Sequence, residues 1–182
     1  MPGHDKKIYL TFDDGPTPDV TDVLLDILKK HGAKATFFCL GKNVVDNIDL
    51  FERINNEGHQ IGNHTWNHLN GKKVGISEYL TSINKTNDII TSKLFRPPYG
   101  RIKNEQAKII SKNFKIIMWS VLSRDFDIKQ SKERCLSVVL KHTKAGSIIV
   151  FHDSLKASNQ MLYAVPRVIE HYQKKGFEFS AI

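Results

Sequence analysis

The chain has 182 residues, of which 40% are hydrophobic and 25% charged, and its formal net charge is +8. This length and ordinary composition exclude a disordered or low-complexity chain and fit one domain with a substantial core. No run of about 18 apolar residues occurs, so a membrane-spanning helix is excluded. The positive charge favours anionic partners, but the lysines are spread along the sequence, which solvated helix faces explain more simply. We expect a monomer with one domain over residues 1–182.

Apolar runs typical of buried strands alternate with segments of helical periodicity along the whole sequence. The expected strands are 8–12, 35–40, 59–62, 94–96, 115–121, 147–152 and 177–181. The expected helices are 17–32, 47–56, 78–92, 105–112, 131–144 and 159–175. Thr17-Pro18 is typical of a helix cap followed by proline in the first turn, and Pro166 predicts a kink or a restart in the last helix.

Strict alternation of about seven strands with helices predicts an α/β fold with a parallel sheet, and seven units fit a barrel better than an open sheet. In such barrels the chemistry gathers at the carboxyl ends of the strands. Polar residues capable of chemistry follow five of the expected strands at this edge: Asp13, Asp14, His64, His68, Arg96, Tyr99, Asp125 and His152.

The segment from Thr11 to Pro16 ends an apolar run with two adjacent carboxylates, Asp13 and Asp14. Asp-Gly-Pro is also good turn chemistry, so on its own the segment fits a plain turn. His64 and His68 are four residues apart and would face one ion if that segment were helical, although a polar loop is the simpler interpretation of the pair alone. Together, a carboxylate and two imidazoles form a zinc site with an open position for water, and the spare carboxylate suits a general base.

Two further segments complete the candidate site. The prolines between Arg96 and Tyr99 fix the chain direction and leave the Tyr99 amide as a free donor suited to an oxyanion, while Arg96 could hold a carboxylate in its ionised form. A simple turn with a surface arginine is the alternative. His152 ends an apolar strand and is either a core histidine or a general acid oriented by a carboxylate such as Asp125.

The remaining histidines fall at helix ends or on helix faces and are interpreted as ordinary: His4, His31, His59, His142 and His171. Cys39 and Cys135 lie in apolar or helical runs without a CxxC partner, which predicts small core residues and disfavours a cysteine metal site. A disulfide between them stays open. Residues 1–7 lack the apolar core of a signal peptide, so either the protein is cytoplasmic or a leader has been removed.

Over about residues 8–182 the chain resembles the polysaccharide deacetylases with the NodB homology domain, carbohydrate esterase family 4. Three motifs match in order: TFDDGP at 11–16, H-[ST]-x-x-H at 64–68 and R-x-P-Y at 96–99. The fourth motif, D-x-x-D-W, departs from the family pattern, since Leu122 and Phe126 replace its first aspartate and its tryptophan while Asp125 is retained. The fifth motif, L-x-H, has Val150 before His152.

The resemblance implies a distorted (β/α) barrel of about seven parallel strands that removes N-acetyl groups from amino sugars of a glycan, of the chitin-oligomer or peptidoglycan type. It also implies roles for the site residues: Asp13 as catalytic base, Arg96 fixing Asp13, the Tyr99 amide at the oxyanion, and His152 as acid with Asp125 behind it. Asp14, His64 and His68 would hold a divalent metal, with zinc expected and cobalt or nickel compatible. Leu122 and Phe126 would alter the sugar-binding wall more than the chemistry.

Three other functions stay open at this point. An O-acetyl esterase acting on acetylated xylan would use the same base, metal and oxyanion donor. A glycan-binding relative that has lost catalysis would explain the altered fourth motif. A nucleic-acid-binding domain, suggested by charge alone, has no aromatic-basic interleaving to support it, so we expect no nucleic-acid partner. The family resemblance suggests the cell envelope or secretion, but the sequence leaves the compartment open.

Overall fold

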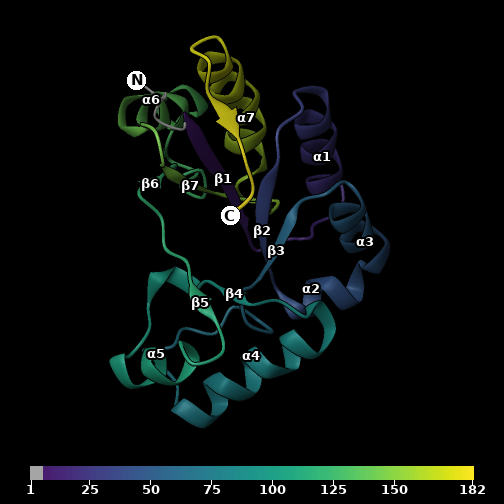
Figure 1. The fold of residues 1–182 in the computed structure, drawn as a ribbon, viewed down its shortest axis with the longest axis vertical. Coiled ribbons are helices and arrows are strands. Elements are labelled where there is room, and N and C mark those ends of the chain that lie inside the picture. Colours follow the sequence, from purple (N-terminus) through teal and green to yellow (C-terminus); the bar gives the residue numbers. More distant parts are fainter. Residues whose placement is uncertain (1–5) are drawn as a thin grey trace.

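A computed structural model describes residues 6–182, so His4 lies outside the described part. Its sheet follows the order β5-β4-β3-β2-β1-β7-β6, with β8 paired to β1, and every pairing is parallel. The strands are β1 (Lys7–Asp13), β2 (Ala35–Cys39), β3 (Gln60–Asn63), β4 (Leu94–Phe95), β5 (Lys115–Ile116), β6 (Val121–Leu122), β7 (Ile148–His152) and β8 (Glu178–Phe179). The expected parallel α/β architecture is therefore confirmed (Figure 1).

The barrel is open on one side. Within residues 6–182 no strand pairing joins β5 to β6, so the seven-strand path curls into a half-barrel instead of closing. The single strand expected over 115–121 is wrong, because the chain forms the short β5 and β6 with an unpaired segment between them. The carbonyls of Ile117 and Met118 in this segment accept hydrogen bonds from the Arg96 guanidinium instead of a neighbouring strand.

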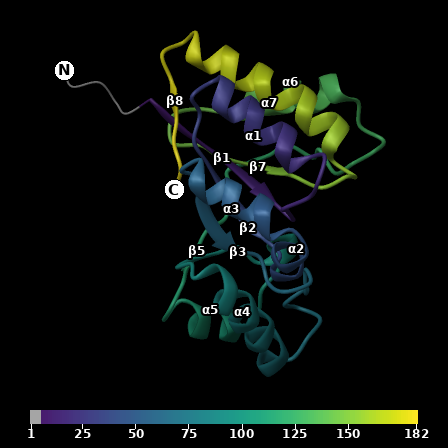
Figure 2. The same cartoon turned by 90° about the vertical axis from the view of Figure 1, so that its right-hand side faces the viewer.

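Helices connect the strands, as the alternation predicts. They are α1 (Thr21–Lys30), α2 (Gly41–Asp46), α3 (Ile48–Asn56), α4 (Ile76–Ile90), the 3₁₀ turn η1 (Pro98–Gly100), α5 (Asn104–Ile110), α6 (Lys132–His142) and α7 (Ser158–Gln173). Helices α6 and α7 lie towards one end of the molecule, and α4 and α5 towards the other (Figures 1 and 2). None of the helices in the described part of the chain has the length and apolarity to cross a membrane.

Two helix predictions were wrong in detail. Thr17-Pro18 does not cap α1, which begins at Thr21, because Asp19 takes a left-handed backbone with φ of 64° and interrupts the first turn. The restart expected in the last helix at Pro166 does not occur, since α7 runs through this residue as one helix. Helix α2 was not expected at all.

The core lies against the central strands β1, β2 and β7. Phe12 of β1 stacks on Phe37 of β2 and Phe151 of β7, with ring centroids 5.2 and 6.1 Å apart. Strands covered on both faces are typical of parallel sheets. Cys39 and Cys135 are free and buried, as expected of core residues, and burial raises the pKa of both thiols. The rigid central strands fix where their carboxyl ends place polar side chains.

Candidate active site

The carboxyl end of β1 carries a buried ion pair. Asp13 is 3% exposed, and its Oδ1 accepts a 2.7 Å hydrogen bond from Nη1 of Arg96, which is fully buried at the end of β4. The same guanidinium also donates to Thr11 Oγ1 and to the carbonyl of Ile117. A buried carboxylate needs such a partner to stay ionised. Arg96 therefore holds Asp13 as an anion with one oxygen, Oδ2, directed towards His64 at 3.9 Å.

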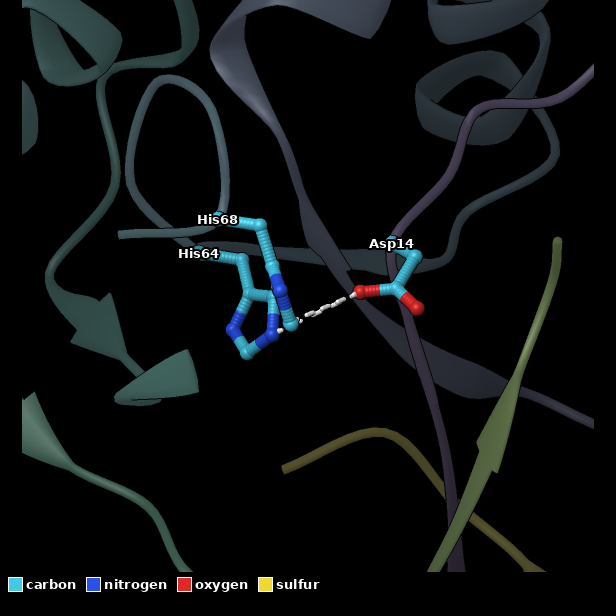
Figure 3. A group of neighbouring side chains, drawn as sticks. All are labelled: Asp14, His64 and His68. Atoms are coloured by element: carbon cyan, nitrogen blue, oxygen red, sulfur yellow. Dashed lines mark ion pairs between the residues drawn. The ribbon is translucent and has the colours of Figure 1, made fainter. Parts of the chain in front are cut away.

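Asp14, His64 and His68 converge on one point (Figure 3). One candidate ligand atom from each lies within 4.8 Å of the other two. His68 Nε2 is 3.2 Å and His64 Nε2 is 3.7 Å from Asp14 Oδ1. The two histidines lie in a loop and not on a helix, which is the simpler of the two interpretations of their spacing. They lie on a loop after β3, in which Thr65 and His68 take left-handed backbones that turn both rings inward.

These three residues fit a divalent metal. His64 Nδ1 lies 2.8 Å from the Arg96 carbonyl, so this nitrogen donates its hydrogen and Nε2 is left as the unprotonated, ligating atom. Asp14 Oδ1 is buried without a hydrogen-bond partner among the described residues, a costly state that a cation would relieve. Burial, with the neighbouring His64, lowers the pKa of His68, which favours the neutral, ligating ring.

His152 ends β7 directly beside Asp13, to which it is paired in the sheet register. Its Nδ1 lies 2.8 Å from Asp125 Oδ1, and its backbone amide donates to Asp125 Oδ2 at 2.7 Å. Burial of the ring opposes its protonation, but the hydrogen bond and charge of Asp125 outweigh that effect and raise the pKa of His152 to about 9. A ring that donates Nδ1–H to a carboxylate keeps Nε2–H available as an acid.

Aromatic side chains line the rim of the site. Tyr99, in the 3₁₀ turn η1, is 61% exposed, and its ring lies edge-on to His68 with centroids 4.4 Å apart. Phe126 lies edge-on to His152 at 5.2 Å, so it contacts the position expected to act as acid. Leu122 lies in β6 and is partly buried. The two departures from the fourth motif thus leave the Asp125–His152 pair intact.

Asp153 was missed by the sequence analysis. It is 1% exposed, and its Oδ1 accepts from the Gly15 amide at 2.9 Å while its Oδ2 accepts from Thr21 Oγ1 at 2.7 Å. Its own amide donates to the Asp13 carbonyl at 3.0 Å. The available signal was an acidic residue directly after the apolar strand that ends at His152.

The histidines interpreted as ordinary that the structure describes are not among the residues of this site. His59 directly precedes β3, as the strand expected over 59–62 predicts, and is 8% exposed. Its Nδ1 accepts a 3.2 Å hydrogen bond from the Ala35 amide, and burial lowers its pKa to about 4. A neutral His59 therefore serves the packing of β2 and β3.

Comparison with known proteins places this geometry in a family. The family model for polysaccharide deacetylase matches residues 1–114. A Bacillus cereus peptidoglycan-N-acetylglucosamine deacetylase is 39% identical over 98% of this chain and 67% of its own length. The Listeria monocytogenes enzyme PgdA is 36% identical over 97% of this chain, which spans 38% of that protein.

Solved structures agree with the sequence matches. The Bc1960 peptidoglycan N-acetylglucosamine deacetylase superposes with a TM-score of 0.94 at 37% identity, covering all of this chain and 88% of that one. The Bacillus subtilis peptidoglycan deacetylase PdaC gives a TM-score of 0.89 at 33% identity, covering 98% and 88% of the two chains. The distorted-barrel fold expected from the motifs is therefore confirmed, and the chain belongs to the polysaccharide deacetylase family of carbohydrate esterase family 4 enzymes.

Proposed function

We propose that this enzyme is a metal-dependent hydrolase that removes N-acetyl groups from amino sugars of a glycan and releases acetate. The observation that carries the proposal is the juxtaposition of three units at one sheet edge: the Asp13–Arg96 pair, the Asp14–His64–His68 trio and the His152–Asp125 pair. Relatives described as deacetylating peptidoglycan N-acetylglucosamine, N-acetylmuramic acid and chitooligosaccharide support this substrate class.

Asp14, His64 and His68 would hold the ion, with zinc expected and cobalt or nickel compatible with the same ligands. A divalent ion there would supply Lewis acidity, polarising an acetamide carbonyl and lowering the pKa of a bound water to about 7.

The remaining groups accept or donate protons and stabilise the negative charge that develops during the reaction. Asp13, kept ionised by Arg96, accepts the proton of the attacking water through Oδ2. The Tyr99 amide donates to the oxygen on which negative charge develops. His152 donates its Nε2 proton to the departing nitrogen, which must leave as an amine, and Asp125 stabilises the charged ring. An amide leaving group requires both this acid and the base.

The experiment is acetate release from a panel of substrates: a chitin oligomer, a peptidoglycan fragment and acetylated xylan, each with the metal-loaded enzyme and with chelator added. We expect acetate from at least one amino-sugar substrate, its loss with chelator and its return with added zinc. The Asp13→Asn and His152→Ala variants should stay folded and lose turnover by at least about 100-fold, the usual contribution of a positioned acid or base.

Two outcomes would contradict the proposal. Acetate released from xylan alone would make the enzyme an O-acetyl esterase. No acetate from any substrate would favour a glycan-binding protein without catalysis; a Bacillus anthracis structural relative with 27% identity is described as a pseudoenzyme of this family. Full activity in Asp13→Asn would remove its assigned role as the base.

A further inference from the structure

The excess positive charge of this protein is concentrated in one part of the chain. Residues 70–115 contain ten Lys and Arg against three Asp and Glu, whereas the rest of the sequence contains 17 against 16. This segment forms α4, β4, η1, α5 and β5, the end of the molecule opposite α6 and α7 (Figure 1). Lysines occur along the whole sequence, but the net positive charge is concentrated in this segment because it contains few acidic residues.

Four of these cations lie on two adjoining loops, and we call them the cationic cluster: Lys72, Lys73, Arg101 and Lys103. The Gln106 side chain joins the loops, donating to the Gly71 carbonyl at 2.9 Å and accepting from the Lys103 amide at 3.0 Å. Lys103 Nζ also reaches across to the Val74 carbonyl at 3.0 Å. The two loops pack so closely that a Cβ on Gly71 would lie 3.0 Å from the Arg101 carbonyl oxygen.

The cationic cluster adjoins the candidate metal site. Its first loop continues directly from His68, and its second continues directly from Tyr99. The rings of His68 and Tyr99 are in edge contact at 4.4 Å, so both loops leave the site at the same point of its rim. A glycan that leaves the candidate metal site on this side of the rim would pass the cationic cluster.

The charges of the cluster are available to a ligand. Lys72, Lys73 and Arg101 are exposed, and within residues 6–182 none of them forms an ion pair. The nearest acidic residues along the chain, Glu78 and Glu105, lie in the first turns of the helices that follow each loop and are likewise outside any ion pair of the described residues. Three exposed cations without a counter-charge attract anions.

We propose that the cationic cluster is an anion subsite that binds a carboxylate carried by the glycan next to the sugar being deacetylated. This inference rests on the proposed function and narrows its substrate. A chitin oligomer is neutral, whereas an N-acetylmuramyl residue carries a lactyl carboxylate. Exposed ion pairs at a rim are individually weak and screened by salt, so the subsite acts on substrate choice and capture more than on the chemical step.

The test compares two substrates of nearly the same shape that differ only at the lactyl carboxyl groups: an alternating N-acetylglucosamine–N-acetylmuramic acid tetrasaccharide and the same molecule with its lactyl carboxylates amidated, which removes their charge. The readout is the ratio of their kcat/KM values for acetate release by the zinc-loaded enzyme. We expect the carboxylate form to be preferred by about three- to tenfold at low salt, from two or three rim ion pairs. The preference should vanish at about 1 M salt, where charges are screened beyond ~3 Å.

Variants of the cationic cluster test whether these residues cause the preference for the carboxylate substrate. The double variant Lys72→Gln/Lys73→Gln, and separately Arg101→Gln, should each reduce this ratio. The matched control is Lys141→Gln/Lys144→Gln, which removes two exposed cations at the α6 end and should keep the wild-type ratio.

Equal kcat/KM for the two substrates in the wild type would overturn the subsite while leaving the proposed deacetylation intact. An equal fall of the ratio in the control variant would also overturn it, because net charge alone would then explain the preference. Failure of every acetylated substrate to release acetate would instead overturn the proposed function, and the subsite with it.

Discussion

Asp14 owes its orientation to residues that take no part in the proposed chemistry. Its φ of 86° is a left-handed backbone, which costs a residue with a side chain on the order of 1–3 kcal/mol. Hydrogen bonds on both sides hold it there: Asn43 Nδ2 donates to the Asp14 carbonyl at 2.7 Å, and the Gly15 amide donates to Asp153 at 2.9 Å. Asp153 is therefore a positioning residue for Asp14, the candidate metal ligand.

We predict that Asp153→Ala weakens zinc binding by about tenfold, because releasing about 1.4 kcal/mol of backbone strain turns Asp14 away from the histidines. The measurement is the dissociation constant of zinc from the metal-free protein, by competition with a chelating dye. Asp153→Asn keeps an acceptor for the Gly15 amide and should lose far less affinity than Asp153→Ala.

The control separates positioning from general stability. Ser92→Ala likewise deletes a buried hydrogen-bonding group, a hydroxyl that bonds the Ile61 carbonyl and the Leu94 amide and not Asp14, His64 or His68. It should lower the free energy of unfolding without changing zinc affinity. If Ser92→Ala weakened zinc binding as much as Asp153→Ala, the assigned role of Asp153 would be wrong.

At the scale of elements, the contact between β2 and β3 depends on an uncharged histidine. His59 accepts a hydrogen bond from the Ala35 amide, and its ring lies edge-on to Phe37 with centroids 5.4 Å apart. Its pKa falls to about 4 in the folded protein, through burial and the charge of Lys34, against an ordinary value of 6.5. Between pH 6.5 and pH 4, His59 is protonated in the unfolded chain but stays neutral in the folded protein. The free energy of unfolding therefore falls as the pH falls through this range.

We predict that His59 lowers the free energy of unfolding by up to about 2 kcal/mol between pH 7 and pH 5. Denaturant unfolding of the metal-free protein at both pH values gives the total pH dependence, which includes other groups. The His59→Gln variant, which cannot titrate at this position, should show a smaller difference between the two pH values than the wild type. The same pH dependence in His59→Gln would contradict this role.

How well each element could be predicted follows from how locally its structure is determined. Strands β1, β2 and β7 are continuous apolar runs buried on both faces, and the sequence alone located them. Residues 115–121 are equally apolar, yet they divide into β5 and β6 because Arg96, distant in sequence, bonds their carbonyls. The sequence of residues 115–121 alone does not predict these hydrogen bonds from Arg96.

In the candidate site, too, some features could be predicted from the local sequence and others depend on residues distant in the sequence. The motifs predicted which residues come together, because each lies at the carboxyl end of a strand where parallel strands converge. They did not predict the loop conformation that brings His64 and His68 together, which depends on left-handed residues and not on helical spacing. The role of Asp153 was not predicted because its partners, Gly15 and Thr21, lie near Asp153 only when β1 and β7 pair.

At the scale of the whole molecule, an ion in the candidate site would link separate parts of an open barrel. Asp14 follows the central strand β1, while His64 and His68 lie on the loop after β3, two strands away. These ligands are brought together only in the folded chain, so binding stabilises it in proportion to ligand concentration. Metal binding can thus be tested through unfolding, independently of any activity.

We predict that zinc at about 100 times its dissociation constant raises the free energy of unfolding by about 2.7 kcal/mol, which corresponds to a rise of about 5–10 °C in Tm for a chain of this size. Chelator should reverse the rise. Asp14→Ala removes a ligand and should abolish the effect, whereas His152→Ala removes only the acid and should keep it in full. A zinc-dependent rise that survives in Asp14→Ala would mean that the ion binds elsewhere, and the trio would then have to be reassigned from metal ligands to a purely polar cluster.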